Sequence, residues 1–82
     1  MTPGLPDPDL TIDTSGTFCP IPVIESQKAI RALDAGQVLL LIATDPGVKT
    51  DMPDWCKAAR HELCALVEEG KTFRVYVRKG KK

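Results

Sequence analysis

The sequence VLLLIAT, which spans Val38–Thr44, contains the longest apolar run in this chain of 82 residues. A short apolar run without polar alternation is typical of a strand buried on both faces. It is far shorter than the ~20 apolar residues that a membrane-spanning helix requires. We therefore expect Val38–Thr44 to form the central strand of a sheet and predict no association with a membrane.

The segment before this strand predicts a strand and then a helix. Asp9–Asp13 alternates polar and apolar residues, so Leu10 and Ile12 should face one side of a half-buried strand. Pro22–Leu33 has helical spacing, with prolines at its front, where they are tolerated, and Gly36 placed for a C-terminal cap. The expected apolar stripe of this helix consists of Val23, Ile24, Ile30 and Leu33.

The segment after the central strand predicts a turn at Asp45–Gly47 and a second helix. Asp51 is a suitable N-cap residue, which places Pro53 in the first turn. Trp55, Ala59 and Leu63 are spaced to share one face of that helix.

The last third of the chain allows two interpretations. Leu66 and Val67 would continue the helical pattern, but Cys64–Glu69 can also form a strand that turns at Gly70 and pairs with Thr72–Lys79. The hairpin is favoured because a lone final strand would lack a partner. The predicted fold class is then α/β, an α+β two-layer sandwich. Its order is β-α-β-α-β-β, with a four-stranded mixed sheet and two helices on one face.

Length, charge and cysteine content limit the possible functions. We predict a flexible tail over residues 1–8, which contain three prolines, and a single domain over residues 9–82. The formal net charge of zero argues against stable nucleic-acid binding, which depends on many cations neutralising phosphates. An odd number of cysteines and the lack of a recognisable signal segment favour a cytoplasmic protein.

The segment GTFCPIPV, residues 16–23, carries the chemistry that we predict. Cys19 precedes a helix, whose first amides and dipole favour negative charge and so favour the reactive thiolate. Pro20 and Pro22 should stiffen the backbone and keep Cys19 and Ile21 out of helical conformation, and Gly16 should allow a loop. Cys19 should therefore project from the surface; the alternative is that it is a small buried apolar residue.

Two blocks of sequence resemble the TusA-like (SirA-like) sulfur carriers from Leu10 onward. The first block is CPIPV (Cys19–Val23) followed by KAI (Lys28–Ile30). The second comprises DPG (Asp45–Gly47), DMP (Asp51–Pro53), WC (Trp55–Cys56) and HEL (His61–Leu63). The resemblance implies the same β-α-β-α-β-β fold, and it implies that Cys19 carries sulfur as a persulfide, with Gly16, Pro20 and Pro22 supporting the motif.

The resemblance also implies partners. Such carriers accept sulfane sulfur from a cysteine desulfurase or a rhodanese-type donor. They pass it to a DsrE-type or TusD-like protein or another acceptor, for tRNA thiolation, molybdenum cofactor assembly or dissimilatory sulfur metabolism. Ile21, where an acidic residue is frequent, and Arg60, where a glycine is frequent, depart from the pattern and leave the pathway open. Charge and analogy suggest docking through Lys57, Arg60, Arg74 and Arg78.

Other candidate residues have simpler interpretations. Cys56 is expected to pack in the core, and the alternative is a resolving thiol for Cys19. Cys64 should pack, and its spacing from Cys56 offers no zinc motif. His61 could act as a base for Cys19, but contacts at a helix end are the simpler use. The acidic residues Asp45, Asp51 and Asp54 are expected to serve turns and caps.

Three classes of function follow. The first is a sulfurtransferase that acts as a stoichiometric, monomeric persulfide carrier without metal or organic cofactor. The second is a non-enzymatic regulatory or protein-binding module of the same fold, in which the thiol is incidental. The third is a redox protein that forms a disulfide between Cys19 and Cys56.

Overall fold

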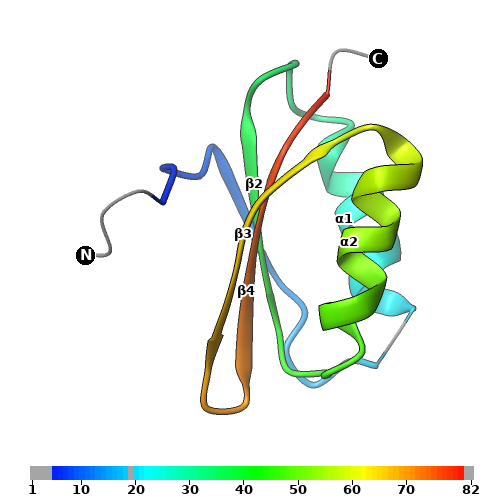
Figure 1. The fold of residues 1–82 in the computed structure, drawn as a ribbon, viewed down its shortest axis with the longest axis vertical. Helices are drawn as coiled ribbons and strands as arrows, with labels where there is room; N and C mark the ends of the chain where they lie inside the picture. Colours follow the sequence, from blue (N-terminus) through cyan, green and yellow to red (C-terminus); the bar gives the residue numbers. More distant parts are fainter. Residues whose placement is uncertain (1–4, 19, 81–82) are drawn as a thin grey trace.

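The computed structural model describes residues 5–18 and 20–80. The elements follow the predicted order β-α-β-α-β-β (Figure 1). Their bounds are β1 Leu10–Asp13, α1 Ile21–Ile30, β2 Val38–Ala43, α2 Val48–Ala59, β3 Glu62–Glu69 and β4 Thr72–Arg78.

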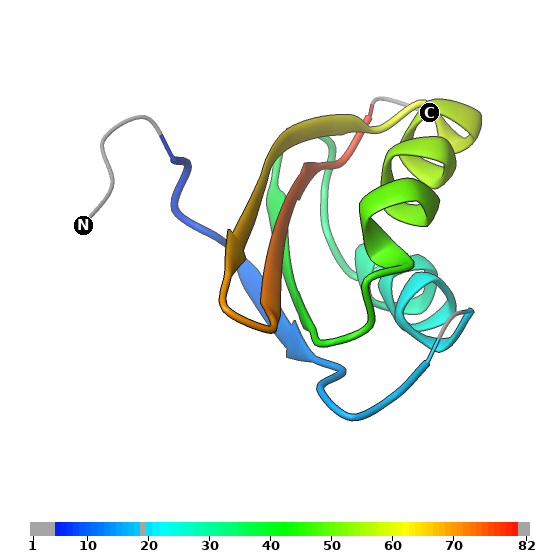
Figure 2. The ribbon, with the colours of Figure 1, turned by 60° about the horizontal axis from the view of Figure 1, so that its bottom comes forward.

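The four strands form one mixed sheet in the order β1-β2-β4-β3. Strand β1 pairs in parallel with β2, with Leu10 opposite Leu39, and β4 pairs with the other edge of β2 in antiparallel orientation. A parallel neighbour requires a crossover connection, which here is α1. Both helices lie on the same face of the sheet (Figures 1 and 2), which confirms the predicted two-layer sandwich.

The main core lies between the sheet and the two helices. Leu39, Leu41, Val75 and Val77 point from β2 and β4 toward the helices and are fully buried. Leu10 and Ile12 pack against this cluster, as the alternation in β1 predicts. The opposite face carries a smaller apolar cluster centred on Val38, Leu40 and Tyr76. Among the described residues, no helix has the length and apolar composition to cross a membrane.

Helix α1 is shorter than the predicted Pro22–Leu33 and starts one residue earlier, so Ile21 is helical although it precedes a proline. The ring of Pro22 is fully buried, and the removal of this apolar surface from water offsets the conformational restriction on Ile21. The helix ends in a turn capped at Arg31, and Gly36 lies beyond it with φ of 89°. Gly36 is therefore a loop residue and not the C-terminal cap.

Helix α2 starts at Val48, one turn earlier than predicted, with Gly47 as its N-cap. The predicted N-cap, Asp51, lies in the first turn and Pro53 lies inside the helix. The buried stripe explains the earlier start, because Val48, Met52 and Cys56 are spaced four residues apart and all face the core.

The end of α2 resolves the ambiguity in the last third of the chain. Helix α2 stops at Ala59, and Leu63 belongs to β3. Strands β3 and β4 pair as the predicted hairpin, with an irregularity between Leu63 and Ala65. Gly70 occupies the turn with φ of 61°, a left-handed conformation that glycine adopts at low cost.

Leu41 provides a test of the core. Its side chain is fully buried between the sheet and the helices, so Leu41→Ala should lower the free energy of unfolding by about 2–5 kcal/mol through lost burial and a cavity. Urea denaturation followed by circular dichroism measures this change. Lys71→Ala, in the exposed hairpin turn, is the matched control and should stay within about 0.5 kcal/mol of wild type. Equal stabilities for both variants would contradict this core assignment.

Candidate functional site

The loop that leads to the Cys-Pro-Ile-Pro motif is anchored to the end of β2. The Thr14 amide and hydroxyl both donate to the Ile42 carbonyl oxygen, at 2.7 and 2.9 Å. The Gly16 amide donates to Oγ1 of Thr44 at 2.9 Å, and Gly16 has φ of 84°. The predicted supporting role of Gly16 therefore has a local basis, since a left-handed residue turns the loop toward β2.

Cys19 lies outside the described residues, so the site is described through its neighbours. On one side, the Phe18 carbonyl oxygen accepts a hydrogen bond from the Ile21 amide at 2.9 Å. On the other side, Pro20 is the N-cap of α1, and its carbonyl oxygen accepts from the Ile24 amide at 3.0 Å. In the chain, position 19 immediately precedes the N-cap of α1.

The first turn of α1 offers an environment suited to an anion. Pro20 has no side-chain acceptor and cannot cap the helix, and the first turn contains no acidic residue. The positive end of the helix dipole is therefore not neutralised by a side chain of that turn. Helix α2 differs, because Asp51 lies in its first turn. A negatively charged sulfur near the start of α1 would be stabilised by this environment.

Three large apolar side chains beside position 19 are exposed to solvent. Phe18 is 74% exposed, Ile21 is 44% exposed and Ile24 is 42% exposed. The sequence pattern assigned Ile24 to the buried stripe, whereas the buried residues of α1 are Pro22, Ser26 and Ile30. Their spacing of four residues would have indicated this stripe if Ser26 had been accepted as a core residue.

The predicted docking residues are distributed over different parts of the molecule. Lys57 lies on the exposed side of the last turn of α2, and Arg60 follows that helix. Arg74 and Arg78 alternate with the core residues of β4 and so point to the helix-free face, where they pair with Glu69 and Glu62 at 2.5 and 3.2 Å. Arg60 and Arg78 share a cavity, but that cavity lies where the helices end.

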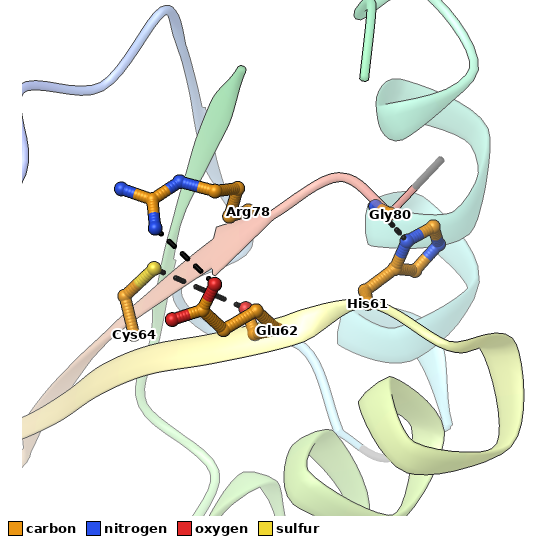
Figure 3. A network of polar contacts seen from close by, with 5 residues as sticks. All are labelled: His61, Glu62, Cys64, Arg78 and Gly80. Carbon is orange, nitrogen blue, oxygen red and sulfur yellow. Dashed lines mark hydrogen bonds and ion pairs between the residues drawn. The ribbon is translucent and has the colours of Figure 1, made fainter. Parts of the chain in front are cut away.

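This cavity has a volume of about 450 Å³. It lies at the far end of the sheet from the start of α1 and is lined by Gly36, Arg60, His61, Glu62, Arg78, Lys79 and Gly80. Figure 3 shows His61 facing Gly80, whose amide donates to its Nδ1 at 3.0 Å, beside the pair formed by Arg78 and Glu62. The ammonium group of Lys79 donates to the Leu33 carbonyl after α1. Cations at this end complement the negative ends of both helix dipoles.

His61 is therefore placed at the wrong end of α1 to serve as a base for Cys19. It lines a second cavity with Ile30 and Arg31 from the last turn of α1, and its ring centroid lies 5.2 Å from that of Trp55. A helix of ten residues is about 15 Å long, which exceeds the reach of direct proton transfer. His61 instead makes contacts at a helix end, which is the simpler of the two interpretations.

Cys56 has the environment of a core thiol. It is 2% exposed, and burial first and the charge of Cys64 second raise the pKa of the Cys56 thiol to about 11. Cys64 is half-buried on the helix-free face, where its thiol lies 4.0 Å from the Glu62 carbonyl oxygen (Figure 3). Buried thiols of high pKa are poor nucleophiles, which favours packing over a resolving role for Cys56.

The acidic residues near the start of α2 serve local structure. The Gly47 amide donates to the Asp45 carboxylate at 3.3 Å, and Asp51 lies in the first turn of α2. Asp54 is exposed on the same helix. Within residues 5–18 and 20–80, no group of three His, Cys, Asp or Glu side chains is placed to hold a metal ion.

The titration of His61 provides a test of its placement where the two helices end. Partial burial, and then the Lys79 cation, lower the pKa of His61 below its usual 6.5. The unfolded chain therefore binds a proton on His61 more tightly than the folded chain does. As a result, the folded state keeps its full stability above pH 6.5 and loses part of it as pH falls through the folded-state pKa of His61. Proton NMR titration should give a value below 6.5, and His61→Gln should weaken the loss of stability on acidification. A pKa above 6.5 would contradict this placement.

The thiol of Cys56 provides a second test. A pKa of about 11 leaves roughly a hundred-fold less thiolate at pH 8 than an ordinary cysteine has. Iodoacetamide should therefore spare Cys56 in the folded protein and label it rapidly in guanidinium chloride. Peptide mapping by mass spectrometry measures both rates. Rapid labelling of Cys56 in the folded state would show that the thiol is accessible and would return it to the candidate site.

Comparison with known proteins agrees with the fold. The family model for sulfurtransferase TusA matches residues 10–79. Among solved structures, the chain is similar to a SirA-like protein from Desulfitobacterium hafniense, with a TM-score of 0.76 and 25% sequence identity. The similarity covers 87% of this chain and 97% of that one. The match to the family model spans most of the chain and includes the Cys-Pro-Ile-Pro motif, so the chain belongs to the TusA sulfurtransferase family.

Proposed function

We propose that this protein is a sulfur carrier that accepts sulfane sulfur on Cys19 as a persulfide and passes it to an acceptor protein. The observation that carries the proposal is the position of residue 19 in the chain, immediately before Pro20, the N-cap of α1, which makes no side-chain capping hydrogen bond, in a chain of the TusA family. Gly16, Pro20 and Pro22 support the segment that presents it. The carrier domain comprises residues 9–82, with residues 1–8 as a tail.

The transfer conserves atoms and electrons. The Cys19 thiolate attacks the terminal sulfur of a donor persulfide, R–S–SH. One sulfur–sulfur bond forms as the donor bond breaks, and the donor leaves as the thiolate R–S⁻. The terminal sulfur keeps its proton or releases it to solvent. The same reaction in the opposite sense delivers the sulfur to an acceptor thiolate, so neither an added oxidant nor a metal is required.

The environment at the start of α1 favours both charged states of this cycle. A helix N-terminus stabilises a thiolate, which is the attacking form. It stabilises an anionic persulfide for the same electrostatic reason. Because the first turn of α1 contains no carboxylate, no like charge from that turn opposes either anion.

The proposed partners and compartment follow from the chemistry. A cysteine desulfurase or a rhodanese-type protein would act as the donor, and a DsrE-type or TusD-like protein would act as one possible acceptor. Free thiols persist in a reducing compartment, which favours the cytoplasm. The sulfur can serve tRNA thiolation, molybdenum cofactor assembly or dissimilatory sulfur metabolism.

A regulatory or protein-binding module of the same fold is the second candidate. It is favoured by the apolar exposure around position 19, which a binding surface needs whether or not sulfur is transferred. The two candidates differ in the acidity of Cys19. A carrier requires a thiol with a lowered pKa, whereas a binding module has no such requirement.

Mass spectrometry of the intact protein separates the two candidates. After incubation with a cysteine desulfurase and L-cysteine, or with a rhodanese and thiosulfate, wild type should gain one sulfur atom that a reductant removes. Cys56→Ser and Cys64→Ser should gain it equally, whereas Cys19→Ser should not. Sulfur loading that persists in Cys19→Ser would refute the assignment of the site. A failure of every donor to load wild type would favour the binding module.

A further inference from the structure

The cavity at the end of the molecule where the helices finish is rich in cations. Its volume of about 450 Å³ lies within the usual range for sites that bind small molecules. Arg60, Arg78 and Lys79 line it, and the one carboxylate on its walls is that of Glu62. A second cavity of about 280 Å³ shares Lys79 with it and adds Arg31. The two cavities together therefore carry four cations and one carboxylate, although the whole chain has a formal net charge of zero.

The helix ends account for only part of this positive charge. The C-terminal end of a helix carries about half an elementary negative charge, so α1 and α2 together contribute about one. Four cations less one carboxylate leave a net charge of +3 on the cavity walls. About two positive charges therefore remain once the dipoles are compensated. A phosphate monoester carries about −1.5 to −2 at pH 7, which matches this excess, whereas a carboxylate carries only about −1.

Arg60 adopts a backbone conformation that arginine does not favour. It follows α2 with φ of 64° and ψ of 36°, and among the described residues it is the one non-glycine residue with positive φ. Its amide caps α2 by donating to the Cys56 and Lys57 carbonyl oxygens, a role that glycine fills without steric cost. Its exposed side chain forms no ion pair with any residue of 5–18 or 20–80. A strained residue whose side chain takes no part in these ion pairs points to a role in binding.

His61 lines both cavities and supplies a further donor. Its Nδ1 accepts a hydrogen bond from the Gly80 amide at 3.0 Å (Figure 3). A neutral imidazole has one donor and one acceptor nitrogen, so the proton is on Nε2. Burial and then the Lys79 cation hold the pKa of His61 below its usual 6.5, which keeps the ring neutral at pH 7. The N–H group at Nε2 is therefore able to donate to an anion.

The walls of the larger cavity are held by backbone contacts. The Gly36 amide donates to the Lys79 carbonyl oxygen at 2.9 Å, and the Lys79 amide donates to the Gln37 carbonyl oxygen at 2.8 Å. A Cβ atom at position 80 would collide with the Arg60 carbonyl oxygen, so glycine is required where the chain passes this wall. The cavity is thus formed without a ligand, and binding does not have to order it.

We propose that this cavity binds the phosphate group of a small phosphate monoester or of free phosphate through Arg60, Arg78 and Lys79. Arginine presents several N–H donors in one plane and pairs with phosphate oxygens in a bidentate manner. The bonds of Arg78 to Glu62 and of Lys79 to the Leu33 carbonyl leave further donors on both cations. The site does not depend on sulfur transfer, because it lies at the opposite end of the sheet from the start of α1.

The experiment titrates the full chain in phosphate-free buffer and follows amide signals by two-dimensional NMR. The ligands are inorganic phosphate, ribose 5-phosphate and adenosine 5′-monophosphate. The test variant is Arg60→Gly, which removes the guanidinium and relieves the backbone strain. Lys57→Ala is the matched control, since it removes one positive charge from the last turn of α2 at a residue that lines neither cavity.

The expected result is saturable binding that depends on Arg60. Wild type should bind at least one of the three ligands with a dissociation constant below about 1 mM, with shifts at Gly36 and Gly80. Arg60→Gly should weaken binding roughly ten- to a hundred-fold, because a hydrogen bond between charged groups is lost. Lys57→Ala should stay within about twofold of wild type. Bound phosphate should also raise the pKa of His61, because a nearby anion favours the imidazolium.

The three ligands distinguish the source of the phosphate group. Equal affinities would identify free phosphate as the ligand. Tighter binding of an ester, with shifts at Gln27 and Trp55, would place its organic part in the second cavity. Both results support the phosphate site.

Three outcomes would overturn the inference. The first is the absence of saturable shifts at up to about 10 mM of every ligand. The second is equal affinity of Arg60→Gly and wild type. The third is an equal loss in Lys57→Ala, which would show attraction by the general charge of this end and not by a site. Circular dichroism should give Arg60→Gly a melting temperature at or above that of wild type, so unfolding does not explain weaker binding.

Discussion

The pairing of β2 on both of its edges is the constraint on which the other elements depend. Its apolar residues face the helices on one side and a smaller apolar cluster on the other. Because β1 lies parallel to β2, the chain must cross over before β2, and α1 is that crossover. The loop before α1 is therefore attached to the end of β2, through Thr14 at Ile42 and Gly16 at Thr44. The position of the candidate site follows from the central strand.

The charged side chains at the ends of the two helices differ. Both start at the end of the sheet where β1 and β2 stop, and both finish at the opposite end (Figure 1). At the finishing end, Arg60 and Lys79 complement the negative ends of the dipoles. At the starting end, α2 has Asp51, but the first turn of α1 has no acidic side chain. The helix whose first turn contains no acidic side chain is the one that follows the predicted nucleophile in the chain, and a negative sulfur would be stabilised there.

The sequence predicted the architecture well because its strongest signals are local. The apolar run of β2, the alternation in β4 and the turn at Gly70 each specify one element, and the order of the elements then limits the topology. Helix boundaries were less predictable. Asp51 is a good N-cap in isolation, but burial of Val48 extends α2 by a turn. This burial depends on tertiary packing, which the helix propensity of single residues does not describe.

The site was predictable only in part for the same reason. The motif at Cys19 is contiguous in sequence and could be recognised directly. The docking residues were chosen by charge, and charge does not reveal that Arg74 points to the helix-free face while Arg60 lies beyond α2. The exposure of Ile24 was missed because its spacing from Val23 and Ile30 suggested a core position. The rotation of α1 about its axis decides exposure, and that rotation is set by the packing of its buried stripe.

The buried stripe of α1 explains why Ile21 and Ile24 are exposed. Ser26 is fully buried, and its hydroxyl lies 4.0 Å from the sulfur of Met52 on α2. A small side chain at this contact allows α1 and α2 to pack closely, and it fixes the rotation that also buries Pro22 and Ile30. With Ser26 inside, Ile21 and Ile24 must face outward. A small domain, with a thin margin of stability, gains nothing internally from exposed isoleucines. A buried serine beside exposed isoleucines reverses the usual pattern. Folded proteins retain local conflicts of this kind at functional surfaces. The same contact that packs the two helices thus presents an apolar surface beside the predicted sulfur carrier.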